Sequence, residues 1–593
     1  MLLERNARFD AFSDNDHAPL NLACERGYLE IVELLLTRGA KIMPDAEGLF
    51  PQHLVARSGQ SPQLLLLLQS HGANLDQLDK LYSWSPLFHA ASEGHVECLQ
   101  TLLNEGVRAD ILDEKELSAL YYASFEGHLE CIRLLSAINI QTSTVHMKDG
   151  VQQAPPPMLG SMSSSAPMPM SMDLDGIPDL CLPPPIIPLR RYGHNFLDTK
   201  TFVQINFDDG DAAPMTFFHN SKYPASRLTI SSKVTDVIPK NIILPFQEDT
   251  RQVSFHTDSL DSFALDIDIF PTYGAKVIAK AVALPSFFKA MQSSSGHCCL
   301  PLWDPRLRAI GQLSFDFHVI KPFAGKPLEM TDFDTYWKST SQNEHAPNAF
   351  VTGSSLVGDY IQLFVQHTCD GIPVLWPRWT MDFMGIEFPI SRLTYAQFIS
   401  AGSRHAAKIA DLSTITSMPF EAIAEIHLAL ASSAISLEDA LHILPPGMHV
   451  ALQIIYPSPT EEQALRLGPV ANVNVFVDSI LDVVFRHARH IRETSPSMMR
   501  SVVFTSYNPT ICTALNWKQP NFPVFICNDL GREGEVEYNG VGSNPGSTKG
   551  DVVVSSGRRT TSVKEAIRIA KENNLMGIIG CSRLLVGSSM VSL

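Results

Sequence analysis

An internal repeat near the start constrains the fold of this chain more than any other feature. Four segments align with one another: residues 18–40, 50–73, 85–107 and 118–140. Each carries one glycine at the same place, and these glycines lie 32, 35 and 33 residues apart: Gly27, Gly59, Gly94 and Gly127. Each unit offers two short amphipathic helices, which cannot bury their apolar faces alone. The sequence therefore predicts a stacked α-helical array over residues 1–140.

The repeat spacing and the Pro-Leu-x-x-Ala start, present at 19–23 and 86–90, resemble ankyrin repeats. That resemblance implies an array that binds proteins on its concave face and carries no chemistry of its own. His89, His95 and His128 are accordingly interpreted as turn and helix-start histidines rather than metal ligands. Cys98 and Cys131 occupy one repeat position and are interpreted as helix-packing residues.

The composition changes abruptly over residues 141–185, which are rich in Pro, Ser and Met. Without apolar periodicity this stretch cannot bury a core, so we expect a disordered linker. Inside it, residues 173–182 alternate acidic and apolar side chains. This segment is either part of the linker or a docking motif that folds onto the groove of a partner.

Short β-rich runs follow over residues 186–325 and predict a β-sandwich: 201–207, 227–232, 253–256, 263–270, 276–284 and 311–323. The phrase PLRRYGHNFLD at 188–198 and the closing strand resemble a C2-like β domain. Five acids are either a calcium cradle, which their spacing fits poorly, or solvated turn residues: Asp208, Asp209, Asp211, Asp266 and Asp268. His297, Cys298 and Cys299 are adjacent, which does not suit tetrahedral zinc ligation.

A second strongly patterned stretch, residues 358–378, reads GDYIQLFVQHTCDGIPVLWPR. Residues 360–366 have the pattern of a buried strand, Asp370 and Gly371 form a hairpin-type turn signal, and residues 372–376 form a second short apolar strand. The stretch resembles the heart of the glycerophosphodiester phosphodiesterase family, which implies a TIM-type (β/α)8 barrel over residues 336–593. The sequence ends where a final β/α unit is expected, so the barrel is either incomplete or closed by an unusual tail.

In active members of that family, this frame carries metal-binding carboxylates, a general-acid histidine and a lysine that faces phosphate. Six positions match those places but hold other residue types: Gln362, Phe364, Pro377, Arg378, Gln453 and Ile455. Residues 336–342 likewise lack the family's His-Arg pair. A neutral amide beside a phenyl ring gives a hard cation almost no anionic oxygen, and proline cannot carry a proton. The resemblance therefore implies no catalytic residue, no metal and no cofactor.

The later barrel segments match the frame of the family. Residues 435–446 predict a capped amphipathic helix, and 474–492 a strand followed by a helix. The basic cluster at 486–492 is either a solvated helix end or a patch for phosphate or an acidic partner. The glycine-rich stretch 540–550 is interpreted as a flexible loop, because its lysine does not follow the glycine that a phosphate loop requires.

Charge and composition exclude several other classes of protein. The 62 acidic and 45 basic residues give a net charge of −17, so no global basic field attracts nucleic acid. The longest apolar runs fall far below the roughly 18 residues of a membrane span. Ten cysteines without a C-x-x-C pair, and the absence of a secretory start, predict an intracellular protein, which we expect in the cytoplasm and nucleus.

Taken together, the repeats, linker, β domain and altered barrel resemble the fungal ankyrin-containing positive regulators of phosphate acquisition. That family implies a non-enzymatic regulator of phosphate-starvation signalling, which inhibits a cyclin-dependent kinase by contacts with the kinase and its cyclin. None of the Lys-rich helices of the family's SPX domain appears in the sequence. The alternative is an active glycerophosphodiester phosphodiesterase that releases glycerol 3-phosphate.

Overall fold

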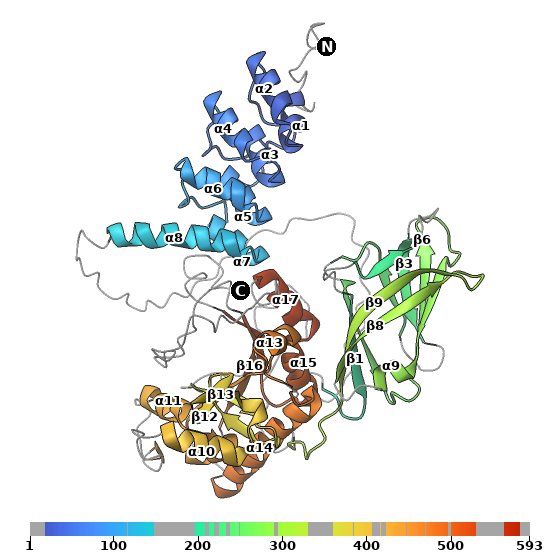
Figure 1. The fold of residues 1–593 in the computed structure, drawn as a ribbon, viewed down its shortest axis with the longest axis vertical. Helices are drawn as coiled ribbons and strands as arrows, with labels where there is room; N and C mark the ends of the chain where they lie inside the picture. The colour runs from blue at the N-terminus through green and yellow to red at the C-terminus, as the bar shows by residue number, and fades with distance from the viewer. Residues whose placement is uncertain are drawn as a thin grey trace, which may run out of the picture. The chain divides into compact units, whose positions relative to one another are not determined.

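A computed structural model describes the chain in sixteen stretches: residues 18–115, 117–146, 196–207, 213–218, 225–232, 238–247, 250–289, 294–329, 360–383, 385–405, 415–416, 423–445, 447–468, 470–495, 500–528 and 562–580. These fall into two compact units. One is the helical array, drawn in blue in Figure 1, and the other comprises the β domain and the barrel, drawn in green to red. Residues 141–146, predicted as the start of the linker, are instead the end of helix α8 (Leu129–His146). The rest of the predicted linker with its segment 173–182, residues 336–342 and residues 540–550 lie outside the described residues.

The array consists of four helix pairs: α1 (Pro19–Glu25) and α2 (Leu29–Thr37), α3 (Pro51–Ser58) and α4 (Gln63–Ser70), α5 (Pro86–Glu93) and α6 (Val96–Asn104), α7 (Ala119–Glu126) and α8 (Leu129–His146). A proline opens α1, α3 and α5, where its missing N–H costs nothing. The Leu, Ala and Cys side chains of successive pairs form one buried core. The predicted ankyrin array is thus confirmed, and Cys98 and Cys131 are fully buried in it as expected.

The β domain is a nine-stranded sheet in the order β4-β3-β6-β7-β8-β9-β1-β5, with β2 pairing with β9. Its strands are β1 (Thr201–Asn206), β2 (Met215–Phe217), β3 (Ala225–Ser231), β4 (Lys240–Ile243), β5 (Gln252–Thr257), β6 (Leu265–Pro271), β7 (Ala279–Ala283), β8 (Ser295–Trp303) and β9 (Ala309–Ile320). Along β6 and β7, buried residues alternate with more exposed ones, as in a sheet with one face on the core. The short helix α9 (Pro285–Lys289) adds Phe288 to that core.

The barrel begins with the predicted hairpin. Strands β10 (Tyr360–His367) and β11 (Pro373–Leu375) pair antiparallel, with Gln366 opposite Val374. Gly371 adopts a φ of +79° in the turn between them, a value that favours glycine. β11 also pairs with β14 (Ile435–Ser436), and a separate hairpin joins β12 (Thr380–Phe383) to β13 (Ile386–Pro389). The short helix η3 (Ile390–Arg392) follows β13.

Five parallel strands follow in the order β10-β15-β16-β17-β18, namely β10 with β15 (His449–Ile454), β16 (Val502–Ser506), β17 (Val524–Asn528) and β18 (Gly577–Gly580). The helices that accompany them are α10 (Tyr395–His405), α11 (Ile423–Ser432), α12 (Leu437–Ile443), α13 (Pro459–Ala464), α14 (Val473–Thr494), α15 (Pro509–Lys518) and α17 (Val563–Glu572). This alternation is the β/α pattern of a barrel. Among the described residues the sheet runs from β14 to β18 without a pairing between its two ends.

Two local predictions for the barrel can be compared directly with the structure. Ser436 caps α12 by accepting a hydrogen bond from the backbone N–H of Asp439, as the sequence indicated. The predicted strand before the helix at 474–492 is wrong, because α14 is one continuous helix of 22 residues. Its start at Val473 follows from Asn472, whose side chain accepts a hydrogen bond from the N–H of Asn474.

Candidate functional site

The neighbouring strands β10 and β15 bring together positions that the phosphodiesterase resemblance singled out. The two strands are parallel neighbours, with Phe364 opposite Gln453. Gln362 donates a short hydrogen bond from its Nε2 atom to the Oε1 atom of Gln453, which is buried. Two amides therefore satisfy each other where the family resemblance places carboxylates, and neither side chain carries a charge.

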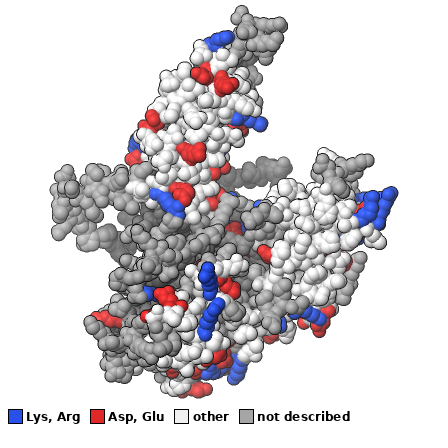
Figure 2. All heavy atoms as spheres, in the orientation of Figure 1, with Lys and Arg blue, Asp and Glu red and all other residues white. Residues whose placement is uncertain are grey.

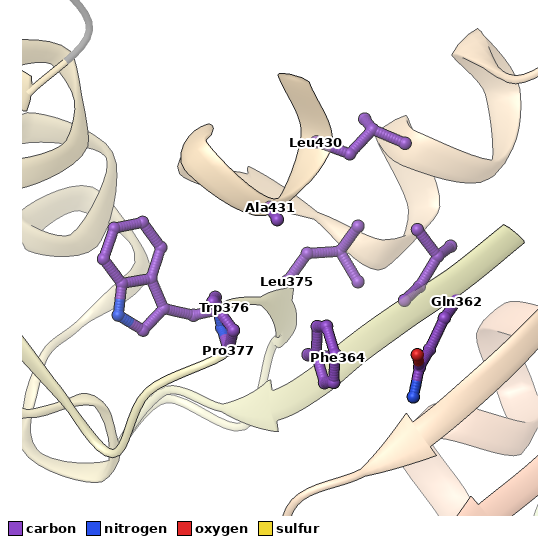
Figure 3. Close-up of a pocket in the computed structure, with 8 residues that line it drawn as sticks. Gln362, Phe364, Leu375, Trp376, Pro377, Leu430 and Ala431 are labelled. Carbon is purple, nitrogen blue, oxygen red and sulfur yellow. The ribbon is translucent and has the colours of Figure 1, made fainter. Parts of the chain in front are cut away.

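A small apolar hollow lies beside this amide pair. Figure 3 shows the Phe364 ring among the side chains that line it, and these are Gln362, Leu363, Phe364, Leu375, Trp376, Pro377, Leu430 and Ala431. Its free space is about 10 Å³, close to the minimum for a single water molecule. The hollow that these described residues line cannot admit a glycerophosphodiester.

The remaining predicted positions lie around the same strand ends. Pro377 lines the hollow, and the backbone carbonyl of Arg378 accepts a hydrogen bond from the Nε2 atom of Gln366. Ile455 directly follows β15 and donates its backbone N–H to the carbonyl oxygen of Val365 at 2.9 Å. The six positions thus lie close together, with Gln362, Phe364 and Pro377 lining the hollow, Gln453 bonded to Gln362, and the backbones of Arg378 and Ile455 bonded to β10.

Two buried histidines near β10 escaped the sequence reasoning, because isolated histidines in apolar runs carry no spacing signal. His427 on α11 packs edge-on against Phe364, with ring centroids 5.9 Å apart, and neither of its ring nitrogens makes a hydrogen bond. Burial lowers its pKa. His367 on β10 contacts the hydroxyl of Ser479, and burial lowers its pKa to about 4. Both rings are neutral near pH 7, so neither holds a proton ready for a leaving group.

Among the described residues, no three His, Cys, Asp or Glu side chains are grouped closely enough to hold a metal ion. Of the acids considered for calcium, Asp268 pairs instead with Lys280, with 3.0 Å between carboxylate oxygen and Nζ. Asp208, Asp209 and Asp211 fall outside the described residues. The adjacent residues at 297–299 do not face one common site, because Cys298 is buried and Cys299 is exposed.

The array builds its turns with an aspartate that recurs every 34 residues, a signal that the sequence reasoning missed. Asp45, Asp79 and Asp113 each accept hydrogen bonds from backbone N–H groups a few residues further on. Asp79 also bonds the Nε2 atom of His89 at 2.8 Å. Burial raises the pKa of Asp79, but the bonds from His89 and from backbone N–H groups outweigh it and lower that pKa to about 2.

The array histidines join neighbouring repeats, as the ankyrin interpretation implies. His95 lies 2.9 Å from the carbonyl oxygen of Arg57, and His128 lies 2.9 Å from that of Ser92, in each case through Nε2. The repeated glycines make room for these rings: a Cβ atom on Gly94 would lie 2.4 Å from the imidazole of His128. The histidines thus act in stacking, and Gly94, with a φ of +77°, could not be replaced without strain.

Exposed apolar side chains lie at the turns that these aspartates build. Leu81 and Tyr82 follow Asp79, and Leu112 precedes Asp113. We call Leu81, Tyr82 and Leu112 the fingertip residues. On the face shown in Figure 2, both acidic and basic side chains are scattered over the array. Exposed residues of both charge signs adjoin the fingertips in the chain, namely Lys80, Glu114 and Lys115. A protein that meets this surface would bury apolar area at the turns beside mixed charge.

The basic cluster of α14 does not form one patch in the structure. Arg486 pairs with Glu438 and Asp482, at 2.7 and 3.0 Å. His487 is buried and accepts a hydrogen bond at 2.9 Å from the guanidinium of Arg500. Arg489 donates hydrogen bonds to the backbone carbonyls of Lys326 and Pro327, in the segment that follows β9. The interpretation as a solvated helix end therefore holds for Arg486, His490 and Arg492, which are exposed, but not for the buried His487.

Comparison with known proteins places these features in a family context. The ankyrin repeat family matches residues 15–46 and, as three copies, residues 52–144, and the family described as GDE1-like C2 domain matches residues 191–324. Ankyrin repeat protein nuc-2 of Neurospora crassa is 58% identical over 98% of this chain and 56% of its own length. Phosphate system positive regulatory protein PHO81 of Saccharomyces cerevisiae is 32% identical over 94% of this chain and 52% of its own.

The chain is a homologue of these fungal proteins. It carries ankyrin repeats and a GDE1-like C2 domain, in the same order as the sequence predicted. Glycerophosphocholine phosphodiesterase GDE1 of Candida albicans is a more distant relative, 22% identical over 97% of this chain and 55% of its own length. The chain spans about half the length of the curated relatives it matches. None of its described helices combines the length and apolar character that a membrane crossing requires.

Proposed function

We propose that this chain is a regulatory protein of phosphate-starvation signalling and that its barrel is a catalytically inactive member of the phosphodiesterase family. Its homologue PHO81 is named as a positive regulatory protein of the phosphate system. The resemblance of the whole arrangement to phosphate regulators implies the target, a cyclin and its cyclin-dependent kinase. The chain inhibits that kinase by surface contacts, and it does so in the cytoplasm and nucleus.

The observation that carries this proposal is the neutral pair of Gln362 and Gln453. A divalent cation is held by anionic oxygen atoms at short range, and it neutralises the charge that develops on a transferred phosphoryl group. Here the amides bond each other, and the buried Phe364 ring lies beside them. Such a site neither attracts the cation nor holds a proton for the leaving alkoxide, so the barrel contributes structure instead of chemistry.

The array supplies the contact surface for the partner. Its fingertip residues are apolar and exposed, on turns that Asp79 and Asp113 hold rigid through several backbone hydrogen bonds each. A rigid surface loses little conformational entropy on binding, which favours affinity. We expect the partner to present apolar side chains with charged residues of both signs around them, because Lys80, Glu114 and Lys115 are exposed beside the fingertips in the chain.

The proposal is tested by mixing the purified chain with a fungal cyclin and cyclin-dependent kinase. We expect the chain to bind the complex and to lower its phosphorylation of a peptide substrate. Replacing Leu81 and Tyr82 by Ser should weaken inhibition by about tenfold or more, since each removes an exposed apolar anchor. A matched control replaces Ile31, which is 47% exposed on α2 compared with 50% for Tyr82, and should leave inhibition unchanged.

Full kinase activity at saturating concentrations of the chain would reject inhibition as its function. Equal inhibition by the fingertip variant and by the parent chain would reject the fingertip surface alone. The alternative function, hydrolysis of glycerophosphodiesters, draws on the distant similarity to GDE1. It would require other residues than those at the six named positions to bind a cation and to donate a proton.

A further inference from the structure

Aromatic side chains from two neighbouring repeats meet at the turn that Asp79 builds. Trp84 ends this turn, and its ring centroid lies 4.4 Å from that of Tyr122 on α7 and 5.3 Å from that of Tyr82. Tyr82 is 50% exposed, and Trp84 and Tyr122 are half-buried. We call Tyr82, Trp84 and Tyr122 the ring cluster. It presents aromatic surface where the third helix pair of the array joins the fourth.

Two polar groups of the ring cluster are bound to one carboxylate. The Oδ2 atom of Asp113 accepts hydrogen bonds from the Nε1–H of Trp84 at 3.2 Å and from the hydroxyl of Tyr122 at 2.6 Å. Its Oδ1 atom accepts the backbone N–H groups of Lys115 and Leu117 at 2.9 Å each. Burial raises the pKa of Asp113, but these bonds outweigh it and lower that pKa, so the carboxylate is ionised near pH 7. A buried negative charge therefore lies against the rings.

A second carboxylate, that of Glu114, lies beside the ring cluster and is exposed. Its Oε1 atom accepts a hydrogen bond at 2.9 Å from the hydroxyl of Ser83, which joins the turn of Asp79 to the turn of Asp113. Ser83 has a φ of +56°, in the left-handed region that favours glycine and asparagine. Because Ser83 stands between Tyr82 and Trp84 in the chain, this bond keeps the Glu114 carboxylate close to the rings.

Lysine side chains also belong to these turns. Lys80 starts against the preceding turn, since a Cβ atom on Gly48 would lie 2.6 Å from the Cβ atom of Lys80. Lys115 directly follows Glu114 and is exposed. Residues 113–115 thus contribute two carboxylates and one ammonium group, so the charge that they place beside the ring cluster is negative overall.

We propose that the ring cluster and Glu114 bind an arginine side chain on an extended segment of the partner protein. A guanidinium is planar and stacks on aromatic rings, whose faces attract a cation. It also donates two parallel N–H groups to a carboxylate such as that of Glu114. The inference rests on the proposed function for the identity of the partner, and it adds the chemical group that the array recognises.

An arginine fits this site better than a proline-rich segment does. A polyproline helix has backbone carbonyls without internal hydrogen bonds, which need donors from the protein that binds it. The donors of Trp84 and Tyr122 are already bound to Asp113. A guanidinium brings its own donors and a positive charge, and the site offers ring faces and carboxylate oxygen atoms to receive them.

The direct test uses the full chain labelled with 5-fluorotryptophan and the probe peptide N-acetyl-Gly-Arg-Gly-amide. The chain has six tryptophans, and the variant Trp84→Phe identifies the fluorine NMR signal of Trp84. We expect the peptide to shift this signal in a saturable way. A peptide with citrulline in place of arginine has nearly the same shape but no charge, and it should bind about tenfold more weakly.

Variants assign the binding to named groups. Glu114→Gln keeps an oxygen atom that accepts from Ser83, so the turn is preserved, and it should weaken binding of the arginine peptide about fivefold. Tyr82→Leu keeps an apolar fingertip without the ring and should weaken binding about threefold. The matched control, Glu105→Gln, changes an exposed acid at the end of α6 and should bind like the parent chain. Thermal unfolding temperatures equal to that of the parent chain show that each variant folds.

An unshifted Trp84 signal, or equal binding of the arginine and citrulline peptides, would overturn the proposal. In the kinase assay, Glu114→Gln should raise the concentration for half-inhibition about fivefold and Glu105→Gln should not change it. Equal inhibition by Glu114→Gln and the parent chain would overturn the role of the site in the partner contact. Peptide binding without any kinase inhibition would reject the kinase function and support the site, whereas inhibition without peptide binding would do the reverse.

Discussion

At the scale of single residues, the proposed inactivity of the barrel depends on a small chemical difference, the presence of amides in place of carboxylates. Gln362 and Gln453 each differ from a carboxylate side chain by one amide group, yet they now bond each other instead of repelling. Two ionised carboxylates at that distance would need a cation between them or a shared proton. The amide pair needs neither, so the strand ends are stable without a metal.

The hydrogen bond between Gln362 and Gln453 can be tested by comparing the stability of single and double variants. Gln453→Leu leaves the Gln362 amide without its acceptor and should lower the free energy of unfolding by about 1–3 kcal/mol. Gln362→Met combined with Gln453→Leu should cost less than the single change, because both polar groups are gone. Urea unfolding of the parent chain, of Gln362→Met and Gln453→Leu alone and of the double variant measures this. A double variant that loses the sum of both single losses would show that the pair is not coupled.

A second prediction at the scale of residues concerns how the stability of the chain falls in acid. Burial, followed by the guanidinium of Arg500, lowers the pKa of His487 to about 3. The unfolded chain takes up this proton near pH 6.5, so the stability that neutral His487 contributes is complete above that pH. It is lost progressively as the pH falls from about 6.5 towards 3.

Replacing His487 by Gln, which can still accept from Arg500, should therefore flatten the fall in stability between about pH 6.5 and pH 4.5. The exposed His490 one turn later is the matched control, and His490→Gln should leave the slope unchanged. Urea midpoints at several pH values provide the measurement. Identical slopes for the parent chain and for His487→Gln would contradict the assignment.

At the scale of elements, the sequence predicted what periodicity and turn signals encode. The array, the hairpin at Asp370 and Gly371, and the capped helix after Ser436 all follow from local patterns, and the structure has them. The strand expected at the start of α14 is absent, because helix capping by Asn472 outweighs the β-prone valines. The aspartates at 45, 79 and 113 were missed, because single acids in loops resemble solvated residues until their backbone bonds are seen.

Part of the candidate site could also be predicted from local sequence patterns. The convergence of Gln362, Phe364 and Gln453 follows once two parallel strands are placed in register. The mutual bond of the amides, the packing of His427 on Phe364 and the small size of the hollow depend on rotamers and helix packing, which no local pattern specifies.

The array turns give a prediction at this scale. Asp79 accepts three backbone N–H groups and the ring of His89, so Asp79→Ala should lower the array's free energy of unfolding by about 2–4 kcal/mol. The matched control is Asp110→Ala, at a residue that pairs with Arg108 on the surface. It should lower the free energy of unfolding by less than about 1 kcal/mol. Comparable losses in thermal unfolding for both variants would contradict the structural role of Asp79.

At the scale of the whole molecule, the β domain and the barrel are parts of one unit. Phe202 of β1 stacks on Trp517 of α15 with ring centroids 4.8 Å apart, and Asn474 of α14 bonds the backbone of Val319 and Lys321. These contacts belong to a core that continues from the strands of one into the helices of the other. The barrel therefore supports the β domain whether or not it catalyses a reaction, which gives a physical reason for keeping its frame.

The proposed inactivity of the barrel is tested most directly by incubating the purified chain with glycerophosphocholine and magnesium or calcium, and measuring release of glycerol 3-phosphate. An inactive barrel should give no release above a mock preparation, because uncharged and apolar side chains stand where a cation and a proton donor are needed. Metal-dependent release that disappears in a variant with a bulkier residue at Ala431, on the wall of the hollow, would contradict it.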